Sequence, residues 1–214
     1  MRKGRFCRNC GDHLPTLARA DAVYCSSACR TFAHRNPFPK QLTQLRQWVR
    51  FNEKKVPLTI DGRYARVNDP STWSDYQSAK DSSAGIGVGF VFNNNGIIGI
   101  DLDHAIENGV VKDWARTFIN SLNPTYTEIS ISGNGIHLLG LGSVEAGRRF
   151  DFPGGAIEVY STARYFTMTG NRFEKTPRKL ADLSGVLDVI NPLVDSMNRE
   201  VSEWRENVFA ALRR

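Results

Sequence analysis

The 214-residue sequence has no apolar run that approaches the ~20 residues a membrane-spanning helix needs. Its first residues are basic, but the apolar segment of a secretory signal peptide does not follow them. Internal repeats and low-complexity tracts are also absent from the sequence. We therefore expect a globular protein of the cytoplasm that has no membrane partner.

Cysteine is absent after residue 29, because all four cysteines lie in the first 29 residues. In a reducing compartment, such clustering argues against disulfides and favours a bound metal. Cys7 and Cys10 form a Cys-x-x-Cys turn, and Cys25 and Cys29 are spaced to lie one turn apart on a helix. Four thiolates in this pattern predict a tetrahedral structural Zn²⁺ site in a module of residues 1–36.

Two alternatives to a four-thiolate zinc site stay open at this point. One is a redox Cys-x-x-Cys, although the βαβ context of such motifs is missing. The other is a site in which His13 or His34 replaces one thiolate. We expect both histidines to be ordinary surface residues. The module is too short to fold by hydrophobic burial alone, which favours the zinc interpretation.

The charge balance is basic, with a net charge of +6 and a sequence pI near 9.3. This balance favours a polyanionic partner, although charge alone gives only non-specific attraction. Aromatic residues interleave with the basic residues of the N-terminal module, a mixture typical of nucleic-acid-binding surfaces. The basic residues are Arg2, Lys3, Arg5, Arg8, Arg19, Arg30 and Arg35, and the aromatic residues are Phe6, Tyr24 and Phe32. A solvated basic surface around a small aromatic core is the simpler alternative.

The main domain is expected over residues 40–190, followed by an amphipathic helix over residues 191–214. Hydrophobic periodicity and turn residues predict the elements of this domain. The predicted strands are 85–92, 97–103, 125–132, 136–140, 156–160 and 164–170, and the predicted helices are 41–49, about 71–79 and 111–121. For residues 48–51, an extension into a strand is the alternative to the end of the first helix. Residues 85–92 and 97–103 are expected to form a β-hairpin. Strands outnumber helices and tight turns join many of them, so the fold class is α+β with a mostly antiparallel sheet.

Two acidic residues, Asp101 and Asp103, end the apolar segment of residues 97–103. Period-two alternation puts both carboxylates on the same face of a strand, roughly 6.5–7 Å apart at Cα. Two such carboxylates repel each other unless a cation lies between them, and oxygen ligands suit Mg²⁺ or Mn²⁺. The simpler alternative is that both acids cap the following turn in solvent.

Glu158 is a single acid in the apolar segment of residues 156–160. Alone, it is most simply a solvent-facing side chain. If its strand neighbours that of Asp101 and Asp103, the three carboxylates share one face. Three carboxylates are what a two-metal catalytic site requires.

A glycine turn with polar flanks follows at residues 132–137. Gly133 and Gly135 would let backbone N–H groups approach phosphate oxygens, and Ser132 and His137 add a hydroxyl and an imidazole. A plain hairpin whose histidine faces solvent is the alternative.

Two cations are further candidates for binding a triphosphate. Arg164 begins an apolar segment, where its guanidinium would form bidentate bonds with phosphate. Lys55, two residues before Pro57, has a weaker claim to the same role. A surface charge is the alternative for each.

These segments together resemble the archaeo-eukaryotic primase superfamily, and most closely the primase-polymerase (PrimPol) branch of phages, plasmids and mobile elements. The resemblance rests on the order of three motifs, with further similarity in the preceding segments, and covers about residues 45–170. The motifs are residues 101–104, 132–137 and 157–167, and the further segments are 55–57, 69–73 and 87–92.

The resemblance implies a catalytic core with an RRM-like sheet that synthesises primers on single-stranded DNA from nucleoside triphosphates. It implies that Asp101, Asp103 and Glu158 hold two Mg²⁺ or Mn²⁺ ions. It also implies that Ser132 and His137 bind the incoming triphosphate, with help from Arg164. The zinc module would grip template DNA or stabilise the initiating nucleotide. Many members of the family continue into a further helical domain or a helicase, so a replicative helicase is a candidate partner.

Two other functions compete with a primase. A non-catalytic, zinc-containing DNA-binding replication protein would account for the charge and the cysteines, but it would leave the three acids on strands unexplained. A metal-dependent nuclease would use the same acids to cut DNA without binding nucleotides.

Overall fold

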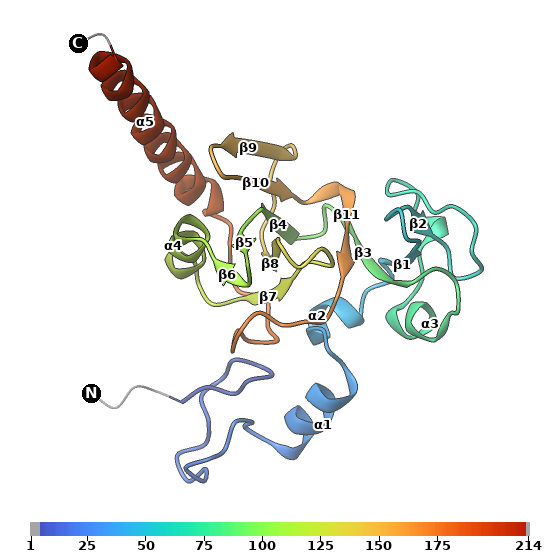
Figure 1. The fold of residues 1–214 in the computed structure, drawn as a ribbon. Coiled ribbons are helices and arrows are strands. Elements are labelled where there is room, and N and C mark those ends of the chain that lie inside the picture. The colour runs from blue at the N-terminus through green and yellow to red at the C-terminus, as the bar shows by residue number, and fades with distance from the viewer. Residues whose placement is uncertain (1–4, 213–214) are drawn as a thin grey trace.

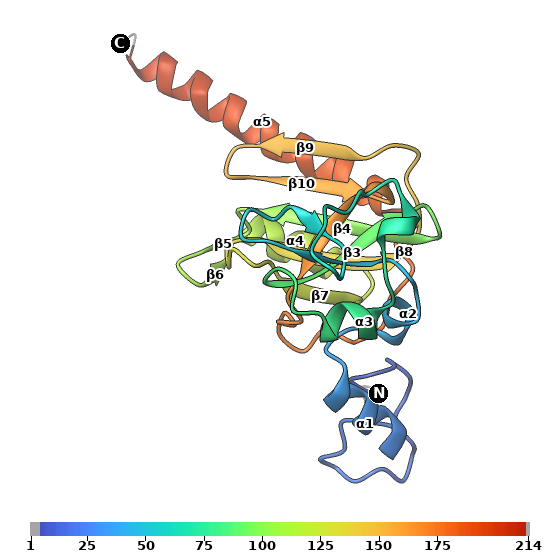
Figure 2. The same ribbon diagram turned by 90° about the vertical axis from the view of Figure 1, so that its right-hand side faces the viewer.

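The computed structural model describes residues 5–212, apart from the side chains of residues 201 and 204–212. Two antiparallel sheets form the centre of the molecule (Figure 1). The N-terminal module lies at one end, and the long helix α5 projects from the other end (Figure 2). The class is therefore mixed α and β with antiparallel sheets, as the sequence predicts.

The larger sheet has five strands in the order β7-β8-β4-β10-β9. These are β7 (Tyr126–Ile129), β8 (Ile136–Leu141), β4 (Ile97–Asp103), β10 (Gly155–Tyr160) and β9 (Arg148–Phe152). The strand that carries Asp101 and Asp103 is thus the middle strand, and it pairs on both sides.

The smaller sheet has four strands in the order β11-β3-β1-β2. These are β11 (Thr162–Met168), β3 (Gly87–Asn93), β1 (Trp48–Phe51) and β2 (Pro57–Leu58), and a separate short pair joins β5 (Ile106–Glu107) to β6 (Val110–Val111). A break in the ladder between Thr162 and Arg164 puts Ala163 in the left-handed region, at φ 52°. Such a bulge bends the strand locally, here at the start of β11, just after the chain leaves β10 of the larger sheet.

The helices are short except for the last one. They are α1 (Ser27–Arg35), α2 (Lys40–Thr43), the 3₁₀ turn η1 (Pro70–Thr72), α3 (Tyr76–Asp81), α4 (Asp113–Ser121) and α5 (Val186–Leu212). Ile98, Ile100 and Leu102 of β4 are fully buried, in one core with apolar residues of α4 and α5. Because side chains alternate along a strand, this packing leaves the opposite face of β4 for its acids.

The two sheets meet over that opposite face. Gly99 of β4 lies against Phe92 and Phe166, since a Cβ at this position would come within 2.2 Å of the Phe92 ring and 2.8 Å of the Phe166 ring. Phe92 and Phe166 pack edge to face, with ring centroids 4.9 Å apart. The acidic half of β4 therefore begins where the aromatic core between the sheets ends.

The predicted hairpin between residues 85–92 and 97–103 is wrong. Strand β3 pairs with β1 and β11, whereas β4 pairs with β8 and β10. The intervening turn reverses the chain and also carries it from one sheet to the other. Turn residues predict a reversal of direction, but long-range packing decides which strands pair.

Three helix predictions need correction. The helix predicted over 41–49 ends at Thr43, because residues 48–51 pair as β1. The helix predicted over 71–79 is a 3₁₀ turn followed by α3, which Asp75 caps through the backbone N–H of Ser78. The C-terminal helix begins at Val186 rather than residue 191, since buried Val186 and Ile190 anchor its first turns.

Some expectations lie outside the described residues, namely those on Arg2 and Lys3 and on the amphipathic character of the predicted C-terminal helix at the side chains of residues 201 and 204–212. Helix α5 is 27 residues long. Even so, no helix in the described part of the chain combines the length and apolar character that a membrane crossing needs.

Candidate active site

One residue from each strand of the larger sheet lies in a single row across that sheet. Direct cross-strand pairs join Glu128 to His137, His137 to Asp101, Asp101 to Glu158, and Glu158 to Arg149. Directly paired residues project to the same face. The row therefore brings together two of the predicted acids and the predicted histidine, and it adds Glu128 and Arg149.

Asp101 lies at the centre of the row. Its carboxylate Oδ1 is 3.7 Å from Nε2 of His137. Burial raises the pKa of Asp101 to about 6; the charges of Asp103 and Glu158 raise it as well, while His137 lowers it. The ionised form of Asp101 is thus destabilised in the folded protein, and a bound metal cation would stabilise it.

Asp103 and Glu158 share one cation, the guanidinium of Arg149. Nη1 of Arg149 donates to Oδ2 of Asp103 at 2.9 Å and to Oε1 of Glu158. Glu158 also accepts bonds from Tyr160 Oη at 2.9 Å and Arg164 Nη2 at 3.0 Å. These bonds hold a buried carboxylate that would otherwise be costly to ionise.

His137 is buried between a second acid and an aromatic ring. Its Nδ1 is 3.4 Å from Oε1 of Glu128, and its ring stacks on Phe166 with centroids 4.6 Å apart. Burial alone would lower the pKa of His137. The hydrogen bond to Glu128 and the charges of Asp101 and Glu128 outweigh burial and raise the pKa. The imidazole is thereby suited to pairing with an anion.

A pocket of about 440 Å³ opens between the two sheets beside this row. Asp101 and His137 line it from the larger sheet, and Arg164 lines it from β11. Lys55 lines it from the turn after β1, where Tyr165 donates its hydroxyl to the Lys55 carbonyl. Four of the predicted site residues therefore face one cavity. Arg164 and Lys55 are cations, and His137 becomes a cation when its imidazole is protonated.

The Ser132 turn is not part of that cavity wall. Ser132 is exposed and bonds to Ser130 Oγ at 3.0 Å and to Asn134. Gly133 has a left-handed φ of 79°, and Gly135 fits closely, since a Cβ there would lie 2.9 Å from Ser130 Oγ. The turn closes the β7–β8 hairpin and positions the start of the strand that carries His137.

The three carboxylates fit a divalent metal by their chemistry and by one stand-in cation. A single guanidinium nitrogen bonds both Asp103 and Glu158, so one positive centre can reach both carboxylates. Among the described residues, however, the four cysteines are the only group of three or more His, Cys, Asp or Glu residues whose ligand atoms all lie within 4.8 Å of one another. Side-chain rotation of Asp101, Asp103 and Glu158 would have to accompany metal binding there.

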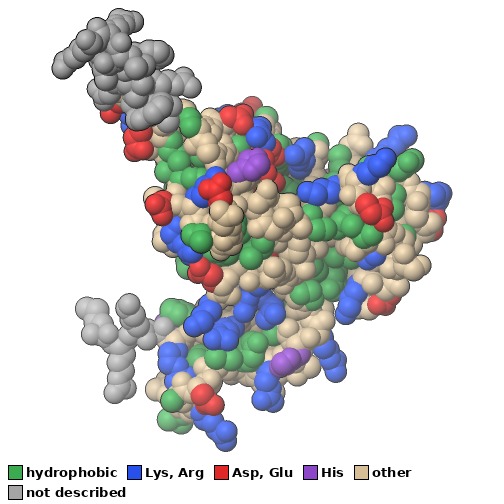
Figure 3. All heavy atoms as spheres, viewed as in Figure 1, with side chains coloured by type: hydrophobic (Ala, Val, Ile, Leu, Met, Phe, Trp, Pro, Cys, Tyr) green, Lys and Arg blue, Asp and Glu red, His purple; other side chains and the backbone are tan. Residues whose placement is uncertain are grey.

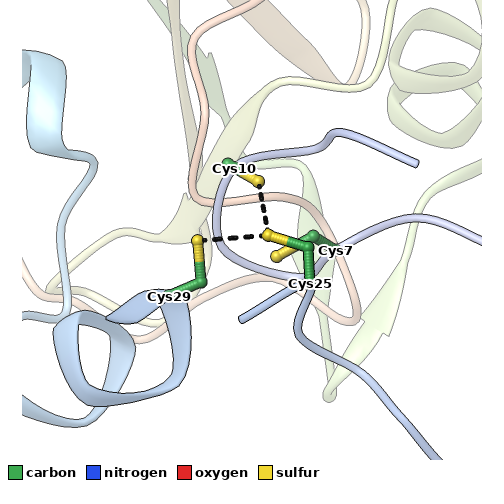
Figure 4. A group of neighbouring side chains, drawn as sticks. All are labelled: Cys7, Cys10, Cys25 and Cys29. Atoms are coloured by element: carbon green, nitrogen blue, oxygen red, sulfur yellow. Dashed lines mark hydrogen bonds between the residues drawn. The ribbon is translucent and has the colours of Figure 1, made fainter. Parts of the chain in front are cut away.

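The four cysteines converge at the N-terminal module (Figure 4). Sγ of Cys25 is 3.5 Å from Sγ of both Cys10 and Cys29, and Cys7 is buried beside them. Cys29 lies in the first turn of α1, but Cys25 precedes this helix, which Ser26 caps through the Cys29 N–H. The expectation that both lie on a helix is therefore wrong for Cys25, although their thiols still meet.

The histidines of the module, His13 and His34, are exposed, as expected. The module contacts the main domain through the Arg8 carbonyl, which accepts from the Arg178 N–H at 3.2 Å, and through an Asp12–Lys179 ion pair of 3.6 Å. Figure 3 shows Lys and Arg side chains gathered on the module and at its junction with the main domain.

Sequence reasoning missed Glu128 and Arg149. Glu128 lies in an alternating segment among Thr and Ile, and its burial depends on the pairing of β7 with β8. Arg149 lies on β9, where the apolar Phe150 and Phe152 alternate with Arg149 and Asp151, so period-two alternation is a signal from which this strand could have been found. The position of Arg149 opposite Glu158 depends on the pairing of β9 with β10.

Comparison with known proteins gives one informative match. The chain is 34% identical over 183 residues to a protein named DNA Primase-polymerase from Nitratiruptor phage NrS-1. The match covers 77% of this chain and 25% of the phage protein, so the chain spans about a quarter of that relative's length. No family model matches the chain. The similarity supports the resemblance to the PrimPol branch.

Proposed function

We propose that this chain is the catalytic part of a DNA primase-polymerase that extends primers on single-stranded DNA by nucleotidyl transfer. The observation that carries the proposal is the row of Asp101, Glu158 and His137 beside a cation-lined pocket between the sheets. The similarity to the phage DNA Primase-polymerase supports it independently. The RRM-like character of the sheet, and the division into a module of residues 1–36, a catalytic domain of residues 40–190 and a C-terminal helix, belong to the same proposal.

In the proposed reaction, a primer 3′-hydroxyl attacks the α-phosphate of a bound nucleoside triphosphate, and pyrophosphate leaves. Asp101, Asp103 and Glu158 would hold two Mg²⁺ or Mn²⁺ ions, which supply charge neutralisation and a more acidic hydroxyl. The protein's own contribution is positioning: it holds three carboxylates on one face of the larger sheet, two on the central strand β4 and one on its neighbour β10.

The pocket supplies the groups that a triphosphate needs. His137, Arg164 and Lys55 present three cationic or proton-donating groups from three different elements. The Arg164 side chain is about half exposed, at 49%, and is therefore free to exchange its bond with Glu158 for a phosphate. Ser132 and the backbone of Gly133 and Gly135 would bind phosphate only if the incoming nucleotide extends along the sheet to that turn.

The N-terminal module would bind the template DNA strand or stabilise the initiating nucleotide. Four thiolates within 4.8 Å fit one tetrahedral Zn²⁺. The basic surface at its junction with the main domain suits the phosphates of single-stranded DNA (Figure 3). Two further parts of the proposal rest on the family resemblance. They are a replicative helicase as partner and a role in the replication of a phage or mobile element.

One assay separates synthesis from the two competing functions. The protein is incubated with single-stranded DNA, Mn²⁺ and labelled nucleoside triphosphates. Labelled products that lengthen with time support the proposal. Shortened DNA supports a nuclease, and unchanged DNA with retained binding supports a non-catalytic replication protein.

Carboxylate variants test the residues in the same assay. Asp101→Ala and Asp103→Ala should each lower incorporation by at least about a thousandfold, because a metal ligand contributes several kcal/mol to such a transition state. The matched control is Asp182→Asn, an exposed acid that only caps Ser184. Full activity in Asp101→Ala would overturn the assignment of the site.

A further inference from the structure

Glu128 is a fully buried carboxylate that the proposed chemistry does not use. Its side chain is 0% exposed. An ionised carboxylate is expensive to bury unless charge or hydrogen bonds compensate it, and an apolar residue of similar size would be cheaper. The position therefore calls for an explanation beyond strand formation.

Four donors surround this carboxylate. Oε2 accepts from Tyr126 Oη at 2.6 Å and from the Gly170 N–H at 2.9 Å. Oε1 accepts from the Thr169 N–H at 3.0 Å and faces His137 Nδ1 at 3.4 Å. The donors from Tyr126, Thr169 and Gly170 fix the carboxylate in place. The fourth donor is His137, and of these four residues it is the one that lines the pocket.

The opposite ring nitrogen of His137 points into the site. Nε2 lies 3.7 Å from Asp101, and stacking on Phe166 restricts the plane of the ring. If Nδ1 donates its proton to Glu128, the rotamer of the ring is fixed and Nε2 remains directed at the pocket. A ring flipped by half a turn about its Cβ–Cγ bond would place a carbon against Glu128 and lose this bond.

We propose that Glu128 is a positioning residue that acts through His137, holding the imidazole so that Nε2 faces the triphosphate pocket. The role at the pocket rests on the proposed function, whereas the Glu128–His137 bond does not. Glu128 touches neither the three carboxylates nor the pocket, so its effect on nucleotide use must pass through the histidine.

The first test reads the bond directly in the full chain. ¹⁵N-histidine labelling gives signals for four histidines, and His137→Gln identifies the signals of His137 by their loss. The wild type should show a slowly exchanging proton on Nδ1 of His137, and Glu128→Gln should lose or displace this proton. A His137 without a protected Nδ1 proton in the wild type would overturn the proposal, even if Glu128→Gln fails to fold.

The second test reads the consequence for nucleotide use. Glu128→Gln should raise the KM for nucleoside triphosphate about tenfold with a smaller change in kcat, the loss expected for one hydrogen bond to a charged group. The matched control is Thr176→Val, which removes a bond of 3.2 Å to the β7 backbone at Thr127 without touching the row. That variant should lower the melting temperature and leave KM unchanged.

The double variant Glu128→Gln/His137→Gln separates positioning from a structural role. If Glu128 acts through His137, the double variant should have the KM of His137→Gln alone. Multiplied effects would overturn the proposal, as would an unchanged KM in Glu128→Gln. If the wild type synthesises nothing, the proposed function fails, and the Nδ1 measurement alone decides whether Glu128 holds the ring.

Discussion

The three acids of the candidate site, Asp101, Asp103 and Glu158, differ in their cationic partners. Asp103 and Glu158 share the guanidinium of Arg149, and Glu158 also pairs with Arg164, whereas the ion-pair partner of Asp101 is the His137 imidazole. A central carboxylate with raised pKa beside two paired ones is the arrangement expected where a cation is to be bound rather than already supplied. This imbalance leads to a prediction about stability as well as activity.

Asp101→Asn should stabilise the metal-free protein near neutral pH while removing its activity. The folded-state pKa of Asp101 is about 6, raised from 3.8 by burial, so ionisation of this acid opposes folding above that pH. The gain should reach up to about 3 kcal/mol at about pH 7.5 and shrink as the pH falls through 6 towards 4. Urea unfolding at several pH values, without added Mg²⁺ or Mn²⁺, measures it.

The exposed acid Asp182 again provides the comparison. Its pKa is lowered by its bonds to Ser184, so Asp182→Asn should slightly destabilise the protein at neutral pH. An Asp101→Asn variant whose gain is the same at every pH would contradict the assignment of the raised pKa to this residue.

Alternation along the chain was sufficient to predict which residues share a face within β4 and within β10, whereas the pairing of these two strands was only a condition of the prediction. Ile98, Ile100 and Leu102 are buried on one side, and Asp101 lies directly opposite Glu158 on the other. The partners of these acids were not predictable in the same way. Arg149 and Glu128 reach the row through the hairpins β9–β10 and β7–β8, and these hairpins come together only by pairing with β4, which is far from both in sequence.

Among the elements, the two sheets fit closely against each other at Gly99. Gly99 lies in β4 two residues before Asp101, and the rings of Phe92 and Phe166 occupy the space a side chain would need. Phe166 in turn stacks on His137. Packing between the sheets and the orientation of the site histidine are therefore linked through one ring.

Gly99→Ala should destabilise the protein by about 1–3 kcal/mol, because an added methyl group must displace aromatic rings in a well-packed core. The control is Gly185→Ala, where the nearest atom to an added Cβ is Asp188 Oδ2 at 3.7 Å, and the change should be below about 1 kcal/mol. Thermal unfolding of both variants measures the difference. Equal stability of the two would show that the sheets separate easily at this point.

Strands were more predictable than their arrangement. The segments of β4, β7, β8, β10 and β11 follow from alternation and turn residues, but β3 and β4 were wrongly paired as a hairpin. Helices near residues 45 and 75 were predicted too long, since propensity over a few residues yields to strand pairing and to a cap at Asp75.

For the whole molecule, the N-terminal module is joined to the main domain by few contacts. Arg172 and Arg178 both donate to the Arg8 carbonyl, and Asp12 pairs with Lys179. An exposed ion pair such as Asp12–Lys179 contributes little, typically below about 1 kcal/mol. If the four thiolates bind zinc as proposed, the metal should therefore supply much of the stability of the module.

Cys10→Ser should abolish zinc binding and unfold the module while leaving the sheets intact. Wild-type protein should contain about one zinc ion per chain by elemental analysis, the content of one tetrahedral four-thiolate site. In the variant, backbone amides of residues 5–36 should lose protection against hydrogen exchange, whereas those of β4 and β8 should keep it.

Ser26→Ala provides the matched control, because it removes the cap of α1 and keeps all four thiols. This variant should retain zinc and cost the module about 1 kcal/mol. Unchanged protection of residues 5–36 in Cys10→Ser would mean that packing, not metal, holds the module.

The order of strands in the larger sheet also has a consequence for how the protein folds. β7–β8 and β9–β10 are hairpins between strands close in sequence. Strand β4 lies between the two hairpins in the sheet, and more than thirty residues separate it from each of its partners, β8 and β10. Local hairpins form early. Distant strand pairings form late, because the entropy cost of closing a long loop is incurred before the paired strands make stabilising contacts. We therefore expect the arrival of β4 to limit the folding rate, and an intermediate without it would hold Glu158 and His137 but neither aspartate. Such a chain would already be compact and would still lack two of the three carboxylates that are proposed to hold the metal ions.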